Sequence, residues 1–206
     1  MNKNESGIIL VSGLPRSGTS MMMQMLEAGG IEPVVDGVRK ADEDNPKGYY
    51  ELEKIKALDT DSAWLGSACG KAVKIISFWL YHLPRENTYK IIFMQREMAE
   101  ILASQKTMLK RRGQPTDKTS DQVMAEKFTI HLKKLSNWLD QQSNMQSIDI
   151  FYNKIILNPA EQSRKINRFL GNRLDVDKMA GVVDSSFYRQ RKTPESQLNG
   201  QKIGFY

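Results

Sequence analysis

The chain has 206 residues, of which 30 are lysine or arginine and 24 are aspartate or glutamate, so its formal charge is +6. With 40% hydrophobic and 26% charged residues, it has the composition of a folded globular protein and not of a disordered or fibrous one. A single cysteine excludes an internal disulfide. One cysteine and two histidines in the whole chain make no convincing zinc site. The excess of positive charge is mild and is not gathered in one arm, so we expect a mixed surface and no nucleic-acid partner.

The apolar segments are short. The longest nearly apolar stretch, Ile75–Leu83, is far below the roughly 18 residues that a membrane-spanning helix needs. Residues 1–7 are polar, and the apolar run behind them, Ile8–Val11, is too short for a secretory signal. We therefore expect no membrane span and a cytoplasmic location. With no internal repeat or low-complexity linker, residues 1–206 are expected to form a single domain.

Strand and helix patterns alternate in the first half of the chain. The β-branched run near the N-terminus predicts a buried strand, and the strong helix formers behind it predict a helix that Gly29 and Gly30 end. Two further strands and a helix of regular apolar spacing follow. The predicted elements are the strand Ile8–Val11, the helix Thr19–Ala28, the strands Val73–Ile76 and Lys90–Met94, and the helix Glu97–Arg112.

The second half continues the alternation. Apolar residues on one face predict a helix over about Ser120 to Gln142, and Ser147–Tyr152 alternates like a strand. For the next helix we expect Asn158 as the cap, Pro159 at the first position and an end at Gly171. This order predicts an α/β three-layer sandwich with a mostly parallel central sheet, similar to P-loop folds. Ligands bind such folds beyond the carboxyl ends of the strands.

The residues between the first strand and the first helix form a candidate phosphate loop, Gly13–Ser20, which we call the anion loop. Its glycines permit tight turns in which backbone N–H groups point at an anion, and the helix N-terminus adds partial positive charge. The spacing matches the loop of nucleoside triphosphatases except that Thr19 stands where those loops have lysine. The cation is instead Arg16, inside the loop. It can neutralise a phosphate oxygen without a metal ion.

Two other interpretations of the anion loop remain open. A P-loop kinase or nucleotide hydrolase needs an acidic residue at a strand end to hold Mg²⁺, and no predicted strand ends in one. A glycine-rich turn between a strand and a helix can also carry no ligand at all.

The anion loop resembles the Pro-[Lys/Arg]-x-Gly-Thr-[Thr/Ser] loop of sulfotransferases that use 3′-phosphoadenosine-5′-phosphosulfate (PAPS), and in particular the Pro-Arg-Ser-Gly-Thr-Thr branch. A second segment is similar to that family's 3′-phosphate motif, in which an arginine at a strand end is followed eight positions later by a helical serine. Here these residues are Arg96 and Ser104. The resemblance implies that PAPS, or its product PAP, is held by Arg16, Ser17, Gly18, Thr19, Ser20, Arg96 and Ser104.

A third segment, Phe151–Pro159, resembles the family's Tyr-Glu-Asp-Leu-x-x-x-Pro segment, although Asn153 and Lys154 replace the acidic pair. The match implies that Tyr152 contacts the adenine, while the alternative is that Tyr152 is a core residue at a strand end. Near the C-terminus, Tyr188–Lys192 lacks the glycine of the family's late basic segment. We therefore expect a solvated tail there, and the role of Arg189, Arg191 and Lys192 stays open.

Transfer of a sulfuryl group needs a base that accepts the proton of the acceptor. Cytosolic sulfotransferases use the histidine of a Lys-Thr-His segment, but the matching residues here are Lys74, Ile75 and Ile76. Other members use a glutamate downstream of the loop, which makes Glu51 our first candidate and Asp36 our second. His82 is a third, more easily read as a surface residue. Glu51 can alternatively favour the start of a helix near Leu52 through its charge.

The sequence as a whole predicts a metal-independent sulfotransferase. It would move a sulfuryl group from PAPS to the hydroxyl or amine of a small-molecule, carbohydrate or lipid acceptor, with Arg16 and Glu51 as catalytic residues. The alternatives are the kinase or hydrolase described above and a non-catalytic nucleotide-binding member of the fold. Neither the acceptor nor the oligomeric state follows from the sequence.

Overall fold

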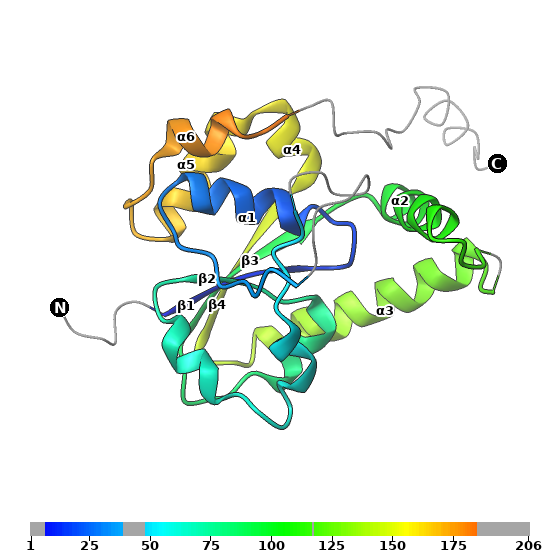
Figure 1. The fold of residues 1–206 in the computed structure, drawn as a ribbon, viewed down its shortest axis with the longest axis horizontal. Coiled ribbons are helices and arrows are strands. Elements are labelled where there is room, and N and C mark those ends of the chain that lie inside the picture. Colours follow the sequence, from blue (N-terminus) through cyan, green and yellow to red (C-terminus); the bar gives the residue numbers. More distant parts are fainter. Residues whose placement is uncertain (1–6, 39–47, 117, 185–206) are drawn as a thin grey trace, which may run out of the picture.

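A computed structural model describes residues 7–38, 48–116 and 118–184. At its centre is a sheet of four parallel strands in the order β2-β1-β3-β4, with helices on both faces (Figure 1). The predicted α/β fold with a parallel sheet is confirmed. The strands are β1 (Ile8–Gly13), β2 (Ala72–Lys74), β3 (Tyr89–Gln95) and β4 (Met145–Phe151).

The strands separate two hydrophobic clusters because successive side chains of a strand point to opposite faces. From β1, Ile9 and Val11 pack with the first cluster, and Ile8 and Leu10 pack with the second. Every residue of β1 is buried, as expected for a strand at the centre of a sheet covered on both sides.

Helices from both ends of the chain cover the first face. They are α1 (Thr19–Ala28), α5 (Pro159–Phe169) and α6 (Val176–Gly181), which lie together above the sheet in Figure 1. Helix α1 contributes Met22, Met23, Met25 and Leu26 to the first cluster, so these methionines fill the core. The short helix α4 (Tyr152–Leu157) joins β4 to α5.

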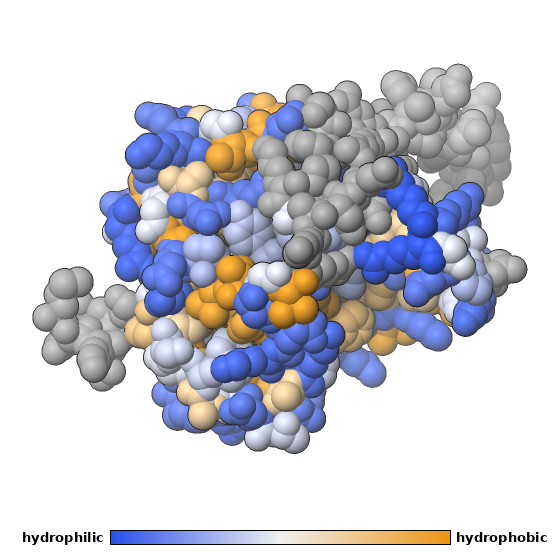
Figure 2. Space-filling view, in the orientation of Figure 1, coloured by the Kyte–Doolittle hydropathy of each residue, from blue (hydrophilic) through white to orange (hydrophobic). Residues whose placement is uncertain are grey.

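The second face is covered by helix α3 (Asp121–Leu139) and by the 3-10 helices η1 (Glu53–Ala57), η2 (Ala63–Ala68) and η3 (Ser77–His82). Helix α2 (Met98–Arg111) leaves the carboxyl end of β3 and lies on the right in Figure 1, next to α3. At its end the basic run Lys110–Arg112 is exposed, and hydrophilic side chains cover this side of the molecule in Figure 2. The run is part of the surface.

Most predicted elements are present with ends shifted by one to three residues, but three details were wrong. Tyr152 does not end the last strand, because the chain turns there into α4. Asn158 stands before α5, but its side chain makes no capping hydrogen bond. The strand predicted over Val73–Ile76 ends at Lys74.

Among the described residues, no helix is both long and apolar enough to cross a membrane. Arg189, Arg191 and Lys192 lie outside the described residues.

Candidate functional site

The anion loop leaves the carboxyl end of β1 and enters α1 within a few residues. Gly13 has a φ of 144°, and a Cβ atom built on it would lie 2.5 Å from Ser17 Oγ and 2.6 Å from the Met94 carbonyl oxygen. The amide of Ser17 donates to the carbonyl of Leu14 at 3.1 Å, which closes a tight turn. The turn therefore requires glycine at position 13, since no larger residue fits between the turn and β3.

Gly18 lies against Tyr152. Its φ is 100°, and a Cβ atom there would be 2.4 Å from Tyr152 Cδ2. The Tyr152 side chain belongs to the first hydrophobic cluster and is 6% exposed, so it is a core residue that also supports the anion loop. Burial raises the pKa of the Tyr152 hydroxyl. The guanidinium carbon of Arg96 lies 4.3 Å from the centre of the same ring, which is a cation–π contact.

Arg16 is held through both its backbone and its side chain. Its φ of 73° lies in the left-handed region, which is uncommon for a residue other than glycine. Arg96 Nη1 donates a 3.0 Å hydrogen bond to the Arg16 carbonyl, and Arg16 Nε donates one of 3.0 Å to Ser104 Oγ. The structure thus brings together three predicted site residues that lie 80 and 88 positions apart.

Glu100 is a member of this site that the sequence did not reveal. Its carboxylate accepts a 3.0 Å hydrogen bond from Arg96 Nε, and the two side chains are only 5% and 8% exposed. A buried ion pair of this kind fixes the orientation of a guanidinium group. The spacing of four residues at the start of α2 was the signal that could have indicated it.

Lys74 is the second residue that was missed. It ends β2 at the carboxyl edge of the sheet, next to Val11 of β1, and is 6% exposed. Its ammonium group donates to the Tyr49 carbonyl and lies 3.4 Å from Ser20 Oγ and 3.8 Å from Glu51 Oε1. A buried lysine needs such partners because desolvation of the charge is costly.

The hydroxyl groups of the anion loop differ in their surroundings. Ser17 Oγ is fully buried and has no hydrogen-bond partner within the described residues. Thr19, the first residue of α1, is 5% exposed. Ser20 Oγ donates to the Tyr49 carbonyl at 3.3 Å, so it links the anion loop to the segment that carries Glu51.

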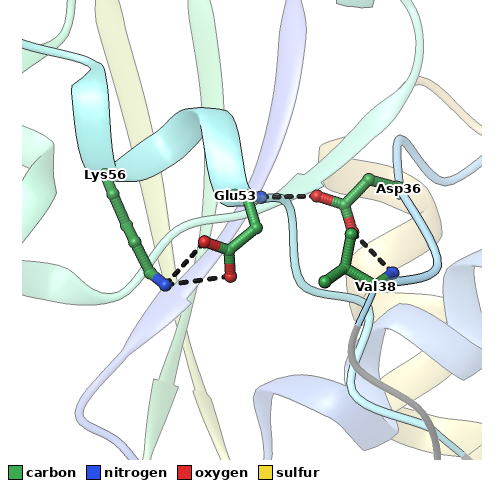
Figure 3. Close-up of polar contacts among 4 residues, drawn as sticks. All are labelled: Asp36, Val38, Glu53 and Lys56. Carbon is green, nitrogen blue, oxygen red and sulfur yellow. Dashed lines mark hydrogen bonds and ion pairs between the residues drawn. The ribbon is translucent and has the colours of Figure 1, made fainter.

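Asp36, the second candidate base, is engaged in local structure (Figure 3). Its two carboxylate oxygens accept hydrogen bonds from the amides of Glu53 at 2.6 Å and of Val38 at 3.0 Å. These bonds lower the pKa of Asp36, so it takes up a proton less readily than an ordinary aspartate. The contacts fit a residue that fixes the start of η1 better than they fit a general base.

Within the described residues, neither histidine is hydrogen-bonded to the anion loop. His82 is exposed on η3, with its ring 5.4 Å from that of Trp79. On α3, His131 Nε2 lies 3.0 Å from Ser77 Oγ. The His131 ring stacks on the Phe78 ring, with the two ring centres 3.9 Å apart. Burial lowers the pKa of His131.

The assembled site is cationic and lies where parallel strands end. Arg16, Arg96 and Lys74 contribute three positive charges, Glu51 and Glu100 contribute two negative ones, and the N-terminus of α1 adds partial positive charge. Such an edge suits a phosphate ester.

Two of three comparisons with known proteins found a match. A structural match to a sulfotransferase domain from the curacin biosynthetic pathway has a TM-score of 0.53 at 14% identity and covers 94% of this chain and 97% of the other, which supports the fold. No curated protein matches the chain in sequence. The family model for the sulfotransferase domain matches residues 7–202. With nearly its whole length matched, the chain belongs to the sulfotransferase domain family.

Proposed function

We propose that the protein transfers a sulfuryl group from PAPS to a hydroxyl or amine acceptor without a metal ion. The observation that carries the proposal is the linkage of Arg16, the cation of the anion loop, to Ser104 and Arg96, the two residues of the predicted 3′-phosphate element. A nucleotide with phosphates at both its 5′ and 3′ positions requires cationic groups at two places on one sheet edge, and this linkage provides them. The acceptor class we propose is a small molecule, a carbohydrate or a lipid.

Within this proposal the protein's residues have distinct tasks. PAPS supplies an activated sulfuryl group, with PAP as the leaving group. The acceptor oxygen or nitrogen forms the new bond to sulfur while its proton passes to Glu51. The bond from sulfur to the bridging phosphate oxygen breaks, and its electron pair stays on that oxygen, where Arg16 and the N-terminus of α1 stabilise the charge.

Lys74 supports a reaction without a metal ion. In nucleoside triphosphatases the hydroxyl at the position of Ser20 binds Mg²⁺. Here the Lys74 ammonium group lies 3.4 Å from that hydroxyl, so a cation of the protein stands beside the usual metal ligand. Its neighbour Glu51, whose side chain is 35% exposed, lies 3.8 Å from the Lys74 ammonium group.

The donor site is tested by calorimetric titration with PAP and with ADP, each with and without Mg²⁺. We expect PAP to bind more tightly than ADP and Mg²⁺ to have no effect on either. Replacing Ser104 or Arg96 by alanine should weaken PAP binding about 10- to 100-fold, since one charge-assisted hydrogen bond contributes about 1.5–3 kcal/mol. Equal affinity for ADP and PAP would refute the 3′-phosphate site, and a requirement for Mg²⁺ would favour the kinase or hydrolase.

Two controls accompany the titration. Arg164→Ala removes an exposed arginine of α5 and should leave PAP binding unchanged. Because Arg96→Ala leaves the Glu100 carboxylate buried without its ion pair, its folding is checked by thermal denaturation. Ser104→Ala removes only a hydroxyl. If Arg96→Ala does not fold, PAP binding by Ser104→Ala tests the 3′-phosphate site instead.

A further inference from the structure

The segment Gly48–Glu51, which carries the proposed base, is fixed along α1 at two points, and we call it the anchor segment. The Tyr49 carbonyl accepts hydrogen bonds from Ser20 Oγ, at the start of α1, and from Lys74. The Tyr50 hydroxyl donates to the Glu27 carboxylate near the end of α1. Ser20 and Glu27 are seven positions apart on the helix, about 10 Å, so the segment and its tyrosine side chain lie along the helix.

Tyr50 has an unusual backbone conformation. Its φ of 52° lies in the left-handed region, where residues other than glycine are rare and persist only when their surroundings hold them. Its side chain packs against the first hydrophobic cluster. The contact with Glu27 is therefore part of what maintains a conformation that tyrosine does not favour by itself.

This conformation determines what the two neighbours of Tyr50 contact. The Tyr49 side chain enters the interior, where it is 4% exposed, while its carbonyl contacts Lys74. Across the turn, the Glu51 carboxylate approaches the same ammonium group, at 3.8 Å. The bend at Tyr50 thus brings a carbonyl and a carboxylate from adjacent residues to one buried cation.

We propose that Tyr50 is a positioning residue whose hydrogen bond to Glu27 keeps the Glu51 carboxylate beside Lys74 and the anion loop. The inference rests on the proposed function, in which Glu51 accepts the acceptor's proton. In this role Tyr50 acts through Glu51 and not by binding the donor or the acceptor. Burial, followed by the hydrogen bond to Glu27, raises the pKa of Tyr50, so its hydroxyl remains a donor through the neutral and mildly alkaline range.

The first test is Tyr50→Phe, which removes only the hydroxyl. We expect kcat to fall about 5- to 10-fold, because a displaced catalytic group loses alignment, while the affinity for PAP changes less than about twofold. The matched control is Tyr89→Phe, which also removes a hydrogen-bonded hydroxyl. The Tyr89 hydroxyl donates to the Pro84 carbonyl, and Tyr89 begins β3, at the end of the strand away from the anion loop. It should leave kcat unchanged. Equal loss in both variants would mean that the effect is general destabilisation.

The second test separates positioning from other roles. In a Glu51→Gln background, Tyr50→Phe should cause no further loss of kcat, since the base on which it acts is gone. Glu27→Ala should reproduce the loss of Tyr50→Phe, and Glu27→Gln, which keeps an acceptor oxygen, should restore most of it. If Tyr50→Phe lowers kcat in the Glu51→Gln background by the same factor as in the wild type, the proposal is overturned.

A measurement that does not depend on activity distinguishes failure of this inference from failure of the proposed function. Hydrogen exchange of amides 49–53 should become about tenfold faster in Tyr50→Phe, because the anchor segment opens more often. Unchanged exchange overturns the inference even if the protein transfers sulfuryl groups. Faster exchange in a protein that sulfates no acceptor supports the anchor and refutes the proposed function.

Discussion

Arg16 combines a left-handed backbone with two hydrogen bonds that fix its position, so its guanidinium group is aligned before a donor binds. Replacing it by alanine should lower turnover about 10²- to 10³-fold, the effect typical of losing one group that stabilises developing charge. Arg16→Lys keeps the charge without the planar donor that contacts Ser104, so its loss should be smaller. Transfer of labelled sulfate from PAPS measures both variants, with thermal denaturation as the control for folding. Unchanged turnover in Arg16→Ala would contradict the proposed role.

Gly18 offers a prediction about stability. In Gly18→Ala the new methyl group would lie 2.4 Å from Tyr152 Cδ2, and the φ of 100° would be strained. We expect the free energy of unfolding to fall by about 1–3 kcal/mol, the usual cost of overpacking. Gly30→Ala is the matched control, because Gly30 has the same φ of 100° but no atom within 4 Å of its added Cβ. Urea denaturation compares the two variants, and an equal loss in both would mean that strain alone, without the tyrosine contact, determines the effect.

At the scale of elements, Asp36 connects the segment behind α1 to η1 and gives the protein a dependence on pH. Its folded-state pKa is lowered from 3.8, chiefly by the hydrogen bond from the Glu53 amide. The carboxylate's contribution to stability is therefore complete above that value and is lost as the pH falls through the lowered folded-state pKa. Asp36→Ala should be less stable than the wild type at pH 7 by about 0.5–1 kcal/mol, as for other lost caps.

The difference between the two proteins should shrink toward pH 2. Thermal denaturation of the wild type and of Asp36→Ala between pH 7 and pH 2 measures this difference in stability. A difference that stays constant or grows in acid would show that the Asp36 carboxylate does not have this role.

The elements also show which features a sequence can reveal. Local patterns predicted β1, α1, β3 and α2, because a β-branched run, helix formers and glycine stops act over a few residues. Tyr152 was assigned to the wrong element because apolar residues continue from Ile150 through Tyr152, whereas the chain turns into α4 at Tyr152, whose ring lies against Gly18. The 3-10 helices between α1 and β2 carry no such periodicity and were not predicted.

The residues of the candidate site likewise include some that the sequence reveals and some that it does not. Arg16, Arg96 and Ser104 could be named because their residue types and spacing follow a motif, and the sheet then brings them together. Lys74 could not be named, since its burial depends on the Tyr49 carbonyl, 25 positions before it, and on Ser20, 54 positions before it. The one signal in the sequence is that Lys74 matches the lysine of the Lys-Thr-His segment, which does not by itself predict that its side chain is buried.

At the scale of the whole molecule, the parallel sheet explains how a small excess of charge becomes a specific site. The strands β2, β1 and β3 are neighbours and run in the same direction, so Lys74, the anion loop and Arg96 all emerge at one edge. The side chains of Lys74 and Arg96 are buried, and they and the half-buried Arg16 have defined partners. Position in the fold therefore matters more to function than total charge.

The hydrogen bond from Arg96 to the Arg16 carbonyl has a consequence for kinetics and thermodynamics. The peptide unit of Arg16 is already turned and is hydrogen-bonded to Arg96, which directly follows β3. It therefore need not be ordered when a nucleotide binds. Association should then be limited by diffusion and by electrostatic attraction, and should slow as salt screens the cationic edge. The entropy lost on binding should come mainly from the nucleotide, since the anion loop has little freedom left to lose.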